Sequence, residues 1–203
     1  MTASQVPGEP GSESSSTDDG WGTLSTEARN PSSDELDSLS TEDVVSLLLE
    51  EDRIGLERAL SRREDIARAA AWTAETLAAD GEVLFAGAGT SGRLGILEAA
   101  ECPPTFGTGP ERIRAVIAGG PDAVFAAREG AEDISEDGAA AVGHLGGGDL
   151  LIAISASSVT PFVLGALESA RKQGARTILV TCAPAGSISA DADLVLALDT
   201  GPE

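Results

Sequence analysis

The chain has 203 residues, of which 41% are apolar, and this is enough for one globular domain with a buried core and additional segments. Acidic residues outnumber basic ones by 34 to 13, and the resulting net charge of −21 disfavours nucleic acid or an anionic membrane as a partner. No apolar run is long enough to span a membrane, and the N-terminus lacks the features of a signal peptide, so we predict a cytoplasmic protein.

The N-terminal part of the chain is predicted to be a tail followed by helices. Residues 1–22 are mainly Ser, Gly, Pro and acidic residues, which bury too little apolar surface to offset the entropy cost of ordering, so we predict a disordered tail. Ser40 and Asp43 form a weak capping-box pattern, which predicts a helix from about 41 to 51. Helical spacing of apolar residues over 54–79 predicts one or two further helices.

From residue 82 onward, short apolar runs alternate with helical stretches. Strands that are apolar throughout and alternate with helices indicate a parallel sheet covered on both faces. We therefore predict a doubly wound α/β domain of five strands over 81–203, preceded by an N-terminal helical segment over 23–80. The predicted strands are 82–87, 113–119, 149–155, 176–182 and 192–198, and the predicted helices lie near 92–101, 121–141 and 160–173.

A glycine-rich turn, "GAGTSGRLG" at 87–95, follows the first strand and opens a helix. Glycines allow the backbone to approach an anion, and the helix N-terminus and nearby hydroxyl groups supply hydrogen-bond donors. The spacing also fits a dinucleotide motif, but the acid expected after the next strand is missing, so a sugar phosphate fits better; a structural turn without a ligand remains the alternative. The candidate binding residues are Gly89, Thr90, Ser91, Gly92 and Arg93.

A second hydroxyl-rich loop, "SASSVTP" at 155–161, follows the third predicted strand. We expect it to face the same crevice, because the carboxyl ends of parallel strands meet at one edge of a sheet. The simpler interpretation is a helix cap with Pro161 at the first helical position, which needs no ligand. The candidate binding residues here are Ser155, Ser157, Ser158 and Thr160.

The remaining chemistry-bearing residues disfavour hydrolysis by a histidine-assisted nucleophile and also zinc chemistry. His144 is the single histidine and lies in a glycine-rich loop, so we expect it to be exposed, and no Ser/His/Asp set is recognisable. Cys102 and Cys182 are expected to be free thiols, and we predict no metal site. Glu98 and Glu101 share one face of the helix after the turn, and the prolines that follow Glu101 are predicted to end this helix.

The long block "GAGTSGRLGILEAAECPPTFG" at 87–107 resembles the signature of the N-acetylmuramic acid 6-phosphate etherases, which contain a sugar isomerase (SIS) domain. Further similar stretches are "TEARNP" at 26–31, "IAGG" at 117–120 and "EGAED" at 129–133, and the resemblance covers about 26 to 203. The family continues beyond this chain, so the resemblance implies a C-terminally truncated member.

The resemblance implies a carbon–oxygen lyase that cleaves the D-lactyl ether of N-acetylmuramic acid 6-phosphate during peptidoglycan recycling. The products would be N-acetylglucosamine 6-phosphate and D-lactate, and no metal or organic cofactor is implied. By position, Glu101 is implied as the acid/base carboxylate and Glu132 as the second catalytic acid. SIS domains commonly pair, and the apolar faces of helices over 41–79 lead us to expect a homodimer.

One departure from the family lies in the second loop. The family pattern "ASGRTP" is replaced by "ASSVTP", so Ser158 and Val159 stand where the family has Gly and Arg. This difference leaves open a non-catalytic sugar-phosphate-binding regulator with the same fold. An isomerase of sugar phosphates is disfavoured because the "ECPP" block is similar to that of the etherases.

Overall fold

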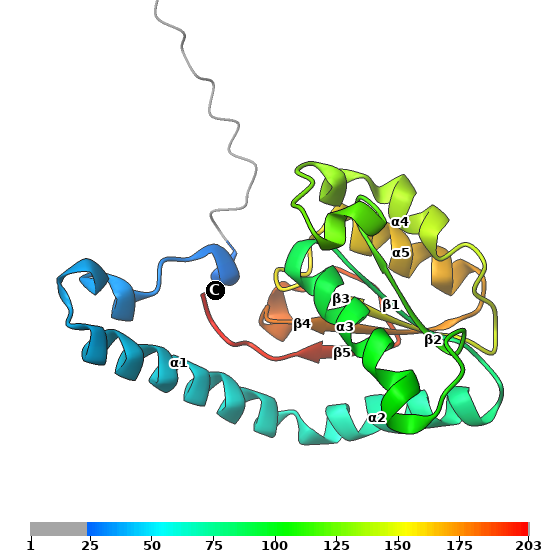
Figure 1. The fold of residues 1–203 in the computed structure, drawn as a ribbon, viewed down its shortest axis with the longest axis horizontal. Coiled ribbons are helices and arrows are strands. Elements are labelled where there is room, and N and C mark those ends of the chain that lie inside the picture. Colours follow the sequence, from blue (N-terminus) through cyan, green and yellow to red (C-terminus); the bar gives the residue numbers. More distant parts are fainter. Residues whose placement is uncertain (1–23, 203) are drawn as a thin grey trace, which may run out of the picture.

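The computed structural model describes residues 24–202. The tail predicted over 1–22 lies outside the described residues. Within them, two long helices lead into a five-stranded sheet with further helices on both of its faces (Figure 1). No helix in the described part of the chain is both long and apolar enough to cross a membrane.

The N-terminal helical part consists of three short 3-10 turns and two α-helices. The turns are Ser25–Glu27, Pro31–Ser33 and Leu36–Ser38, and the helices are α1 (Thr41–Ser61) and α2 (Arg63–Ala78). α1 begins as predicted, because the Ser40 hydroxyl oxygen accepts a hydrogen bond from the Asp43 N–H at 3.2 Å.

The predicted end of the first helix near residue 51 is wrong. α1 continues for ten further residues, through a segment that contains no proline. Arg53 pairs with Glu50, one turn before it, at 2.6 Å, and with Glu57, one turn after it, so the charged stretch supports the helix instead of ending it.

The sheet is entirely parallel, with the strand order β2-β1-β3-β4-β5. All five predicted strands are confirmed, and each lies within its predicted range. Buried apolar residues fill these strands on both faces, as expected for a sheet covered on both sides. The strands are β1 (Val83–Gly87), β2 (Ile113–Ile117), β3 (Leu150–Ile154), β4 (Arg176–Thr181) and β5 (Leu194–Ala197).

The helices form one layer on each face of the sheet (Figure 1). α4 (Ser135–Ala141) and α5 (Pro161–Lys172) lie on one face, where the core includes Leu84, Leu151 and Phe162. α2 and α3 (Gly89–Phe106) lie on the other face, where Val83, Leu150 and Ile178 are buried. This arrangement confirms the doubly wound α/β fold preceded by N-terminal helices.

Two further helix predictions need correction. The helix expected over 121–141 is instead a 3-10 turn at Pro121–Val124, another at Ala131–Asp133, and the short α4. Gly130 precedes the second 3-10 turn with a φ of 78°, a left-handed conformation that an α-helix cannot contain, and the extended Ile134 separates this turn from α4.

The helix after the glycine-rich turn is longer than predicted. Pro103 and Pro104 do not end α3 but lie inside its last turn; the helix ends at Phe106 and is followed by the cap Gly107, whose φ of 69° is left-handed. The Gly107 N–H donates to the Pro103 carbonyl at 2.9 Å, which closes the helix in the manner of a glycine C-cap.

Candidate active site

The two candidate loops meet at the carboxyl edge of the sheet. β1 ends at Gly87 and its neighbour β3 ends at Ile154, and these two residues are partners in the parallel ladder. The chain leaves β1 into α3 on one face of the sheet and leaves β3 into α5 on the other face. The space between two loops that diverge in this way is where doubly wound proteins bind ligands.

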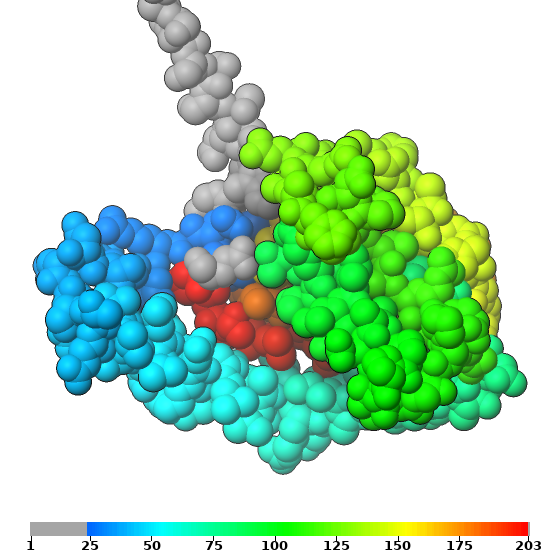
Figure 2. All heavy atoms as spheres, in the orientation of Figure 1, coloured from blue at the N-terminus to red at the C-terminus, as the bar shows by residue number. Residues whose placement is uncertain are grey.

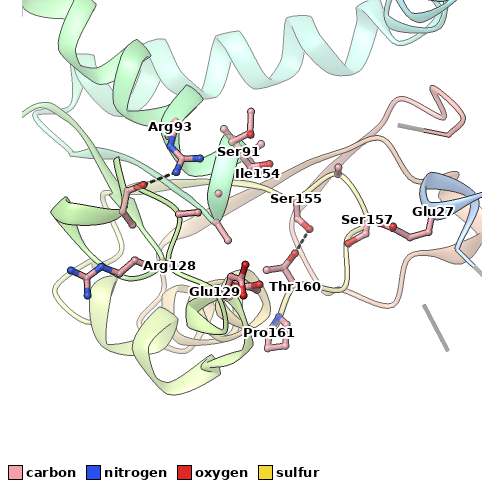
Figure 3. A pocket seen from close by; sticks show the side chains of 18 residues that line it. Glu27, Ser91, Arg93, Arg128, Glu129, Ile154, Ser155, Ser157, Thr160 and Pro161 are labelled. Carbon is pink, nitrogen blue, oxygen red and sulfur yellow. Dashed lines mark hydrogen bonds between the residues drawn. The ribbon is translucent and has the colours of Figure 1, made fainter. Parts of the chain in front are cut away.

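A cavity of about 710 Å³ lies at this edge, and we call it the edge cavity (Figure 3). Most of the predicted site residues line it: Gly89, Thr90, Ser91, Arg93, Glu132, Ser155, Ser157 and Thr160. Three predicted residues do not line it: Gly92, Glu101 and Ser158. The structure therefore brings both loops and one of the two implied catalytic glutamates to a single cavity.

The start of α3 presents unpaired backbone donors to the edge cavity. The first intrahelical bond runs from the Gly92 N–H to the Ala88 carbonyl at 3.2 Å, and Ala88 makes no side-chain cap. The N–H groups of Gly89, Thr90 and Ser91 precede this bond, so the helix itself leaves them free. Together with the hydroxyls of Thr90 and Ser91, they suit an anion at the positive end of the helix dipole.

Gly92 has a packing role. A Cβ atom at this position would lie 2.5 Å from Ile117 Cγ1 and 2.7 Å from the Gly87 carbonyl oxygen. The absence of a side chain therefore allows α3 to lie directly against β1 and β2. The third glycine of the turn sets the distance between helix and sheet and makes no contact with the edge cavity.

Arg93 lines the edge cavity and also donates two hydrogen bonds to the protein backbone. Its Nε donates to the Val124 carbonyl at 2.9 Å, and its Nη2 donates to the Ala123 carbonyl at 2.8 Å. These bonds tie α3 to the 3-10 turn Pro121–Val124, which precedes the segment that carries Glu132. Arg93 therefore holds the walls of the cavity together.

The hydroxyls of the second loop bond to one another and to the loop backbone. Ser155 Oγ lies 2.8 Å from Thr160 Oγ1 (Figure 3), and it accepts a hydrogen bond from the Ser158 N–H at 3.1 Å. Pro161 occupies the first helical position, as predicted, but Thr160 makes no side-chain cap to α5. The Thr160 hydroxyl is thus directed to Ser155 across the loop.

Ser158 has an unfavourable conformation for a residue with a side chain. Its φ is 66°, it is only 1% exposed, and its hydroxyl has no hydrogen-bond partner among the described residues. The family pattern has glycine at this position, and glycine adopts this φ without steric cost. Ser158 is therefore strained, and it does not line the edge cavity.

Three carboxylates line the edge cavity. Glu132 comes from the 3-10 turn Ala131–Asp133, Glu129 lies three residues before it, and Glu27 comes from the N-terminal turn Ser25–Glu27 (Figure 3). Arg128, which pairs with Asp122 at 2.7 Å, is a further lining residue. Glu27, Arg128 and Glu129 were not predicted, although "TEARNP" and "EGAED" contain two of them.

Glu101 does not reach the edge cavity of its own chain. It is exposed and lies about three turns beyond Gly89 in α3, which is about 18 Å along the helix axis. Glu98 on the same helix is also exposed, as expected for a surface charge. Burial, followed by the Glu98 charge, raises the pKa of the Cys102 thiol, which keeps this thiol protonated.

Two other predictions concern residues outside the cavity. Cys102 and Cys182 are both free thiols, as predicted. His144 is exposed, also as predicted, and its Nε2 lies 3.3 Å from the Glu82 carboxylate. Neither of these features lines the edge cavity.

Comparison with known families identifies the SIS domain of this chain. Residues 65–171 match the family model described as the glucokinase regulatory protein N-terminal SIS domain. The chain belongs to this family. The matched range contains the glycine-rich turn, the second loop and Glu132, and it thus includes most of the edge cavity.

Curated relatives agree with the resemblance found in the sequence. A protein of Trichormus variabilis named N-acetylmuramic acid 6-phosphate etherase is 47% identical over 184 residues, which are 90% of this chain and 60% of that protein. A protein of the same name from Synechocystis is 42% identical over the same share of each chain. The chain therefore spans about 60% of the length of these relatives.

Solved structures confirm the fold. A phosphoheptose isomerase from Francisella tularensis superposes with a TM-score of 0.61 at 21% identity, covering 79% of this chain and 86% of that one. A phosphoheptose isomerase from Neisseria gonorrhoeae gives a TM-score of 0.56 at 23% identity, with 77% and 85% coverage.

Proposed function

We propose that this chain belongs to a carbon–oxygen lyase that cleaves the D-lactyl ether of N-acetylmuramic acid 6-phosphate. The products would be N-acetylglucosamine 6-phosphate and D-lactate, and the reaction would serve cell-wall amino sugar recycling in the cytoplasm. The main support is one cavity that combines a free helix N-terminus, hydroxyl-rich loops and Glu132. The etherase name of relatives up to 47% identical supports the choice of reaction.

The phosphate of the substrate is assigned to the start of α3. Backbone N–H groups at Gly89–Ser91 and the hydroxyls of Thr90 and Ser91 converge on this end of the edge cavity. In a chain with a net charge of −21, an anion needs such local donors to bind. Ser155, Ser157 and Thr160 then line the space for the sugar.

The reaction requires proton transfer by carboxyl groups. A carboxylate removes the proton from C2, which is acidic because C2 is next to the C1 aldehyde of the open-chain sugar. The C3–O bond breaks, lactate leaves after its oxygen takes a proton from a carboxylic acid, and water then adds its hydroxyl to C3 and a proton to C2. Glu132 lies in the edge cavity and is our candidate for one of these carboxyl groups.

The proposed role of Glu101 requires a second copy of the chain. Because Glu101 lies far from the edge cavity of its own chain, it can reach a substrate only in an assembly. We therefore propose a homodimer in which the SIS domain from residue 81 is preceded by a helical segment, over 23–80, that takes part in the interface. The exposed apolar residues of α1 support this assignment.

Titration calorimetry tests the proposed ligand. N-acetylglucosamine 6-phosphate is expected to bind, whereas N-acetylglucosamine without the phosphate is expected to bind at least tenfold more weakly, by the loss of about 1.5–3 kcal/mol in charge-assisted hydrogen bonds. Ser91→Ala should weaken binding of the phosphorylated sugar, and the matched control Ser187→Ala, outside the edge cavity, should not. Equal affinity for both sugars would contradict the proposal.

Turnover of N-acetylmuramic acid 6-phosphate tests the reaction. Because the relatives are longer, the assay should use this chain and a chimaera that adds the C-terminal part of the Trichormus variabilis relative. In an active form, Glu132→Gln and Glu101→Gln should each lower the rate by about 10²–10⁴-fold, while Glu98→Gln should have little effect. Solvent deuterium should appear at C2 of the product, and a product without it would exclude this mechanism.

The second candidate function is a sugar-phosphate-binding regulator. It is favoured by the strained Ser158 and by Val159, which replace a glycine and an arginine of the etherase pattern, and by a family model that is named after a regulatory protein. Tight binding of the sugar phosphate without turnover in the chimaera would support the regulator over the lyase.

A further inference from the structure

Glu27 is brought to the edge cavity from a distant part of the chain. It ends the 3-10 turn Ser25–Glu27, which precedes β1 by the whole length of α1 and α2. In the site, the Glu27 side chain lies on the side of Ser157, and Glu129 and Arg128 lie on the other side (Figure 3). The cavity is thus completed by a segment outside the sheet domain.

The turn that carries Glu27 is anchored by its neighbours. Thr26 is 1% exposed, so it is packed into the protein beside the cavity. Asn30 caps the next turn and its Nδ2 donates to Glu51 Oε2 in α1 at 3.1 Å. These contacts fix the backbone on both sides of Glu27, while the Glu27 side chain itself remains exposed at the cavity.

The Glu27 carboxylate has no charged partner within residues 24–202 that would explain its position. None of the ion pairs there includes Glu27. An ionised carboxylate only accepts hydrogen bonds, so its natural partner is a hydroxyl or an amide N–H. It also repels a second anion placed at the same end of the cavity, by an amount that is larger in a partly enclosed site than in water.

We propose that Glu27 is a specificity-determining residue of the edge cavity. It accepts a hydrogen bond from a hydroxyl or amide N–H of the bound sugar, and it excludes sugars that carry a second phosphate at that end. This inference rests on the proposed function, because it takes the ligand to be a sugar monophosphate whose phosphate lies at the start of α3. The inference assigns to Glu27 the recognition of the uncharged part of the sugar phosphate.

Calorimetry with three ligands distinguishes recognition of the sugar by Glu27 from a purely structural role of this residue. The probes are N-acetylglucosamine 6-phosphate, glucose 1,6-bisphosphate and inorganic phosphate, titrated into the full chain. Glu27→Ala should weaken binding of the monophosphate by about tenfold or more, because a hydrogen bond to a charged group is lost. It should leave the affinity for inorganic phosphate unchanged and should strengthen binding of the bisphosphate.

Two further variants complete the experiment. Glu27→Gln keeps a hydrogen-bond acceptor but removes the charge, so it should retain more of the monophosphate affinity than Glu27→Ala while also gaining affinity for the bisphosphate. Glu35→Ala is the matched control, since Glu35 is an exposed glutamate of the same N-terminal segment that does not line the edge cavity. Its three affinities should equal those of the wild type.

The outcomes distinguish failure of this inference from failure of the proposed function. If the wild type binds the monophosphate no better than inorganic phosphate, the proposed function fails and this inference fails with it. If the wild type binds the monophosphate tightly and Glu27→Ala binds it equally well, only the role of Glu27 is overturned. An equal loss for the monophosphate and inorganic phosphate would also overturn it, because the effect would then not concern the sugar.

Discussion

Gly92 illustrates how one side chain, or its absence, decides the geometry of the candidate site. The glycine allows α3 to approach β2, because a Cβ would meet Ile117 and the Gly87 carbonyl at less than 3 Å. This close approach places the free N–H groups at the start of α3 beside the end of β1. The motif spacing predicted an anion turn, and the packing explains why its third glycine is needed.

Gly92→Ala is expected to destabilise the protein. The added methyl group must displace Ile117 or move α3 from the sheet, and such overpacking costs about 1–3 kcal/mol in the free energy of unfolding. Urea denaturation followed by circular dichroism measures this change. Gly55→Ala is the control, since a Cβ at Gly55 in α1 would meet nothing within 4 Å, and its stability should be unchanged or higher. Equal stability of both variants would contradict the packing argument.

Ser158 shows the opposite case, in which a side chain is present where the backbone favours glycine. A left-handed φ and a buried hydroxyl without a partner both raise the energy of the folded state. Ser158→Gly is therefore expected to raise the free energy of unfolding by about 1 kcal/mol. Thermal denaturation with Ser157→Gly as the control tests this, because Ser157 does not have a positive φ and its Oγ accepts a hydrogen bond from the Val159 N–H at 3.4 Å. A lower melting temperature for Ser158→Gly would show that the serine is not strained.

Helix α1 depends on its own sequence more than on packing. None of its residues is buried, so its first turn is stabilised mainly by the Ser40 cap. α3 differs, because its buried glycines allow it to pack closely against the sheet, and its last turn contains two prolines. The capping residue therefore determines where α1 begins, whereas contacts with the sheet determine how far α3 extends.

Ser40→Ala is expected to destabilise the first turn of α1 by about 1 kcal/mol, since the Asp43 N–H loses its acceptor. Amide hydrogen exchange of residues 42–45 should become faster, while exchange in β1 and β3 should not change. Ser46→Ala is the control within the same helix, because the Ser46 hydroxyl only donates to the Glu42 carbonyl. Unchanged exchange in Ser40→Ala would mean that other contacts hold the start of the helix.

In the described part of the chain, α1 lies as an arm beside the sheet domain (Figure 1, Figure 2). Three of its large apolar side chains, Leu48, Leu49 and Leu56, are between 57% and 63% exposed. Apolar surface of this kind is typical of an interface with another chain. The distance of Glu101 from the edge cavity agrees with the same proposal of a homodimer.

Light scattering at micromolar concentration tests the assembly. We expect the wild type to have the mass of a homodimer, and Leu49→Glu combined with Leu56→Glu to have the mass of a monomer with unchanged helical content, because burying two added charges is unfavourable. Ser46→Glu, which adds one charge at an already polar position of α1, serves as the control and should remain dimeric. A monomeric wild type would contradict both the interface and the proposed role of Glu101.

The five strands, the glycine-rich turn and the second loop were predictable because each depends on neighbouring residues. Apolar runs favour buried strands, and glycine and hydroxyl residues favour turns and helix starts. The sequence did not predict that the helix expected over 121–141 is interrupted. The composition of this stretch favours a helix, and the left-handed conformation of Gly130 is seen only in the structure.

Contacts between segments that are distant in the sequence determine which residues line the edge cavity. Glu27 lines the edge cavity because the N-terminal turn lies beside the sheet, whereas Glu101 does not line it because it lies about three turns beyond the start of α3. Local sequence patterns specify the conformation of a segment, but not which segments pack together. That choice is made by burial of apolar surface over the whole chain, and it is visible only in the tertiary structure.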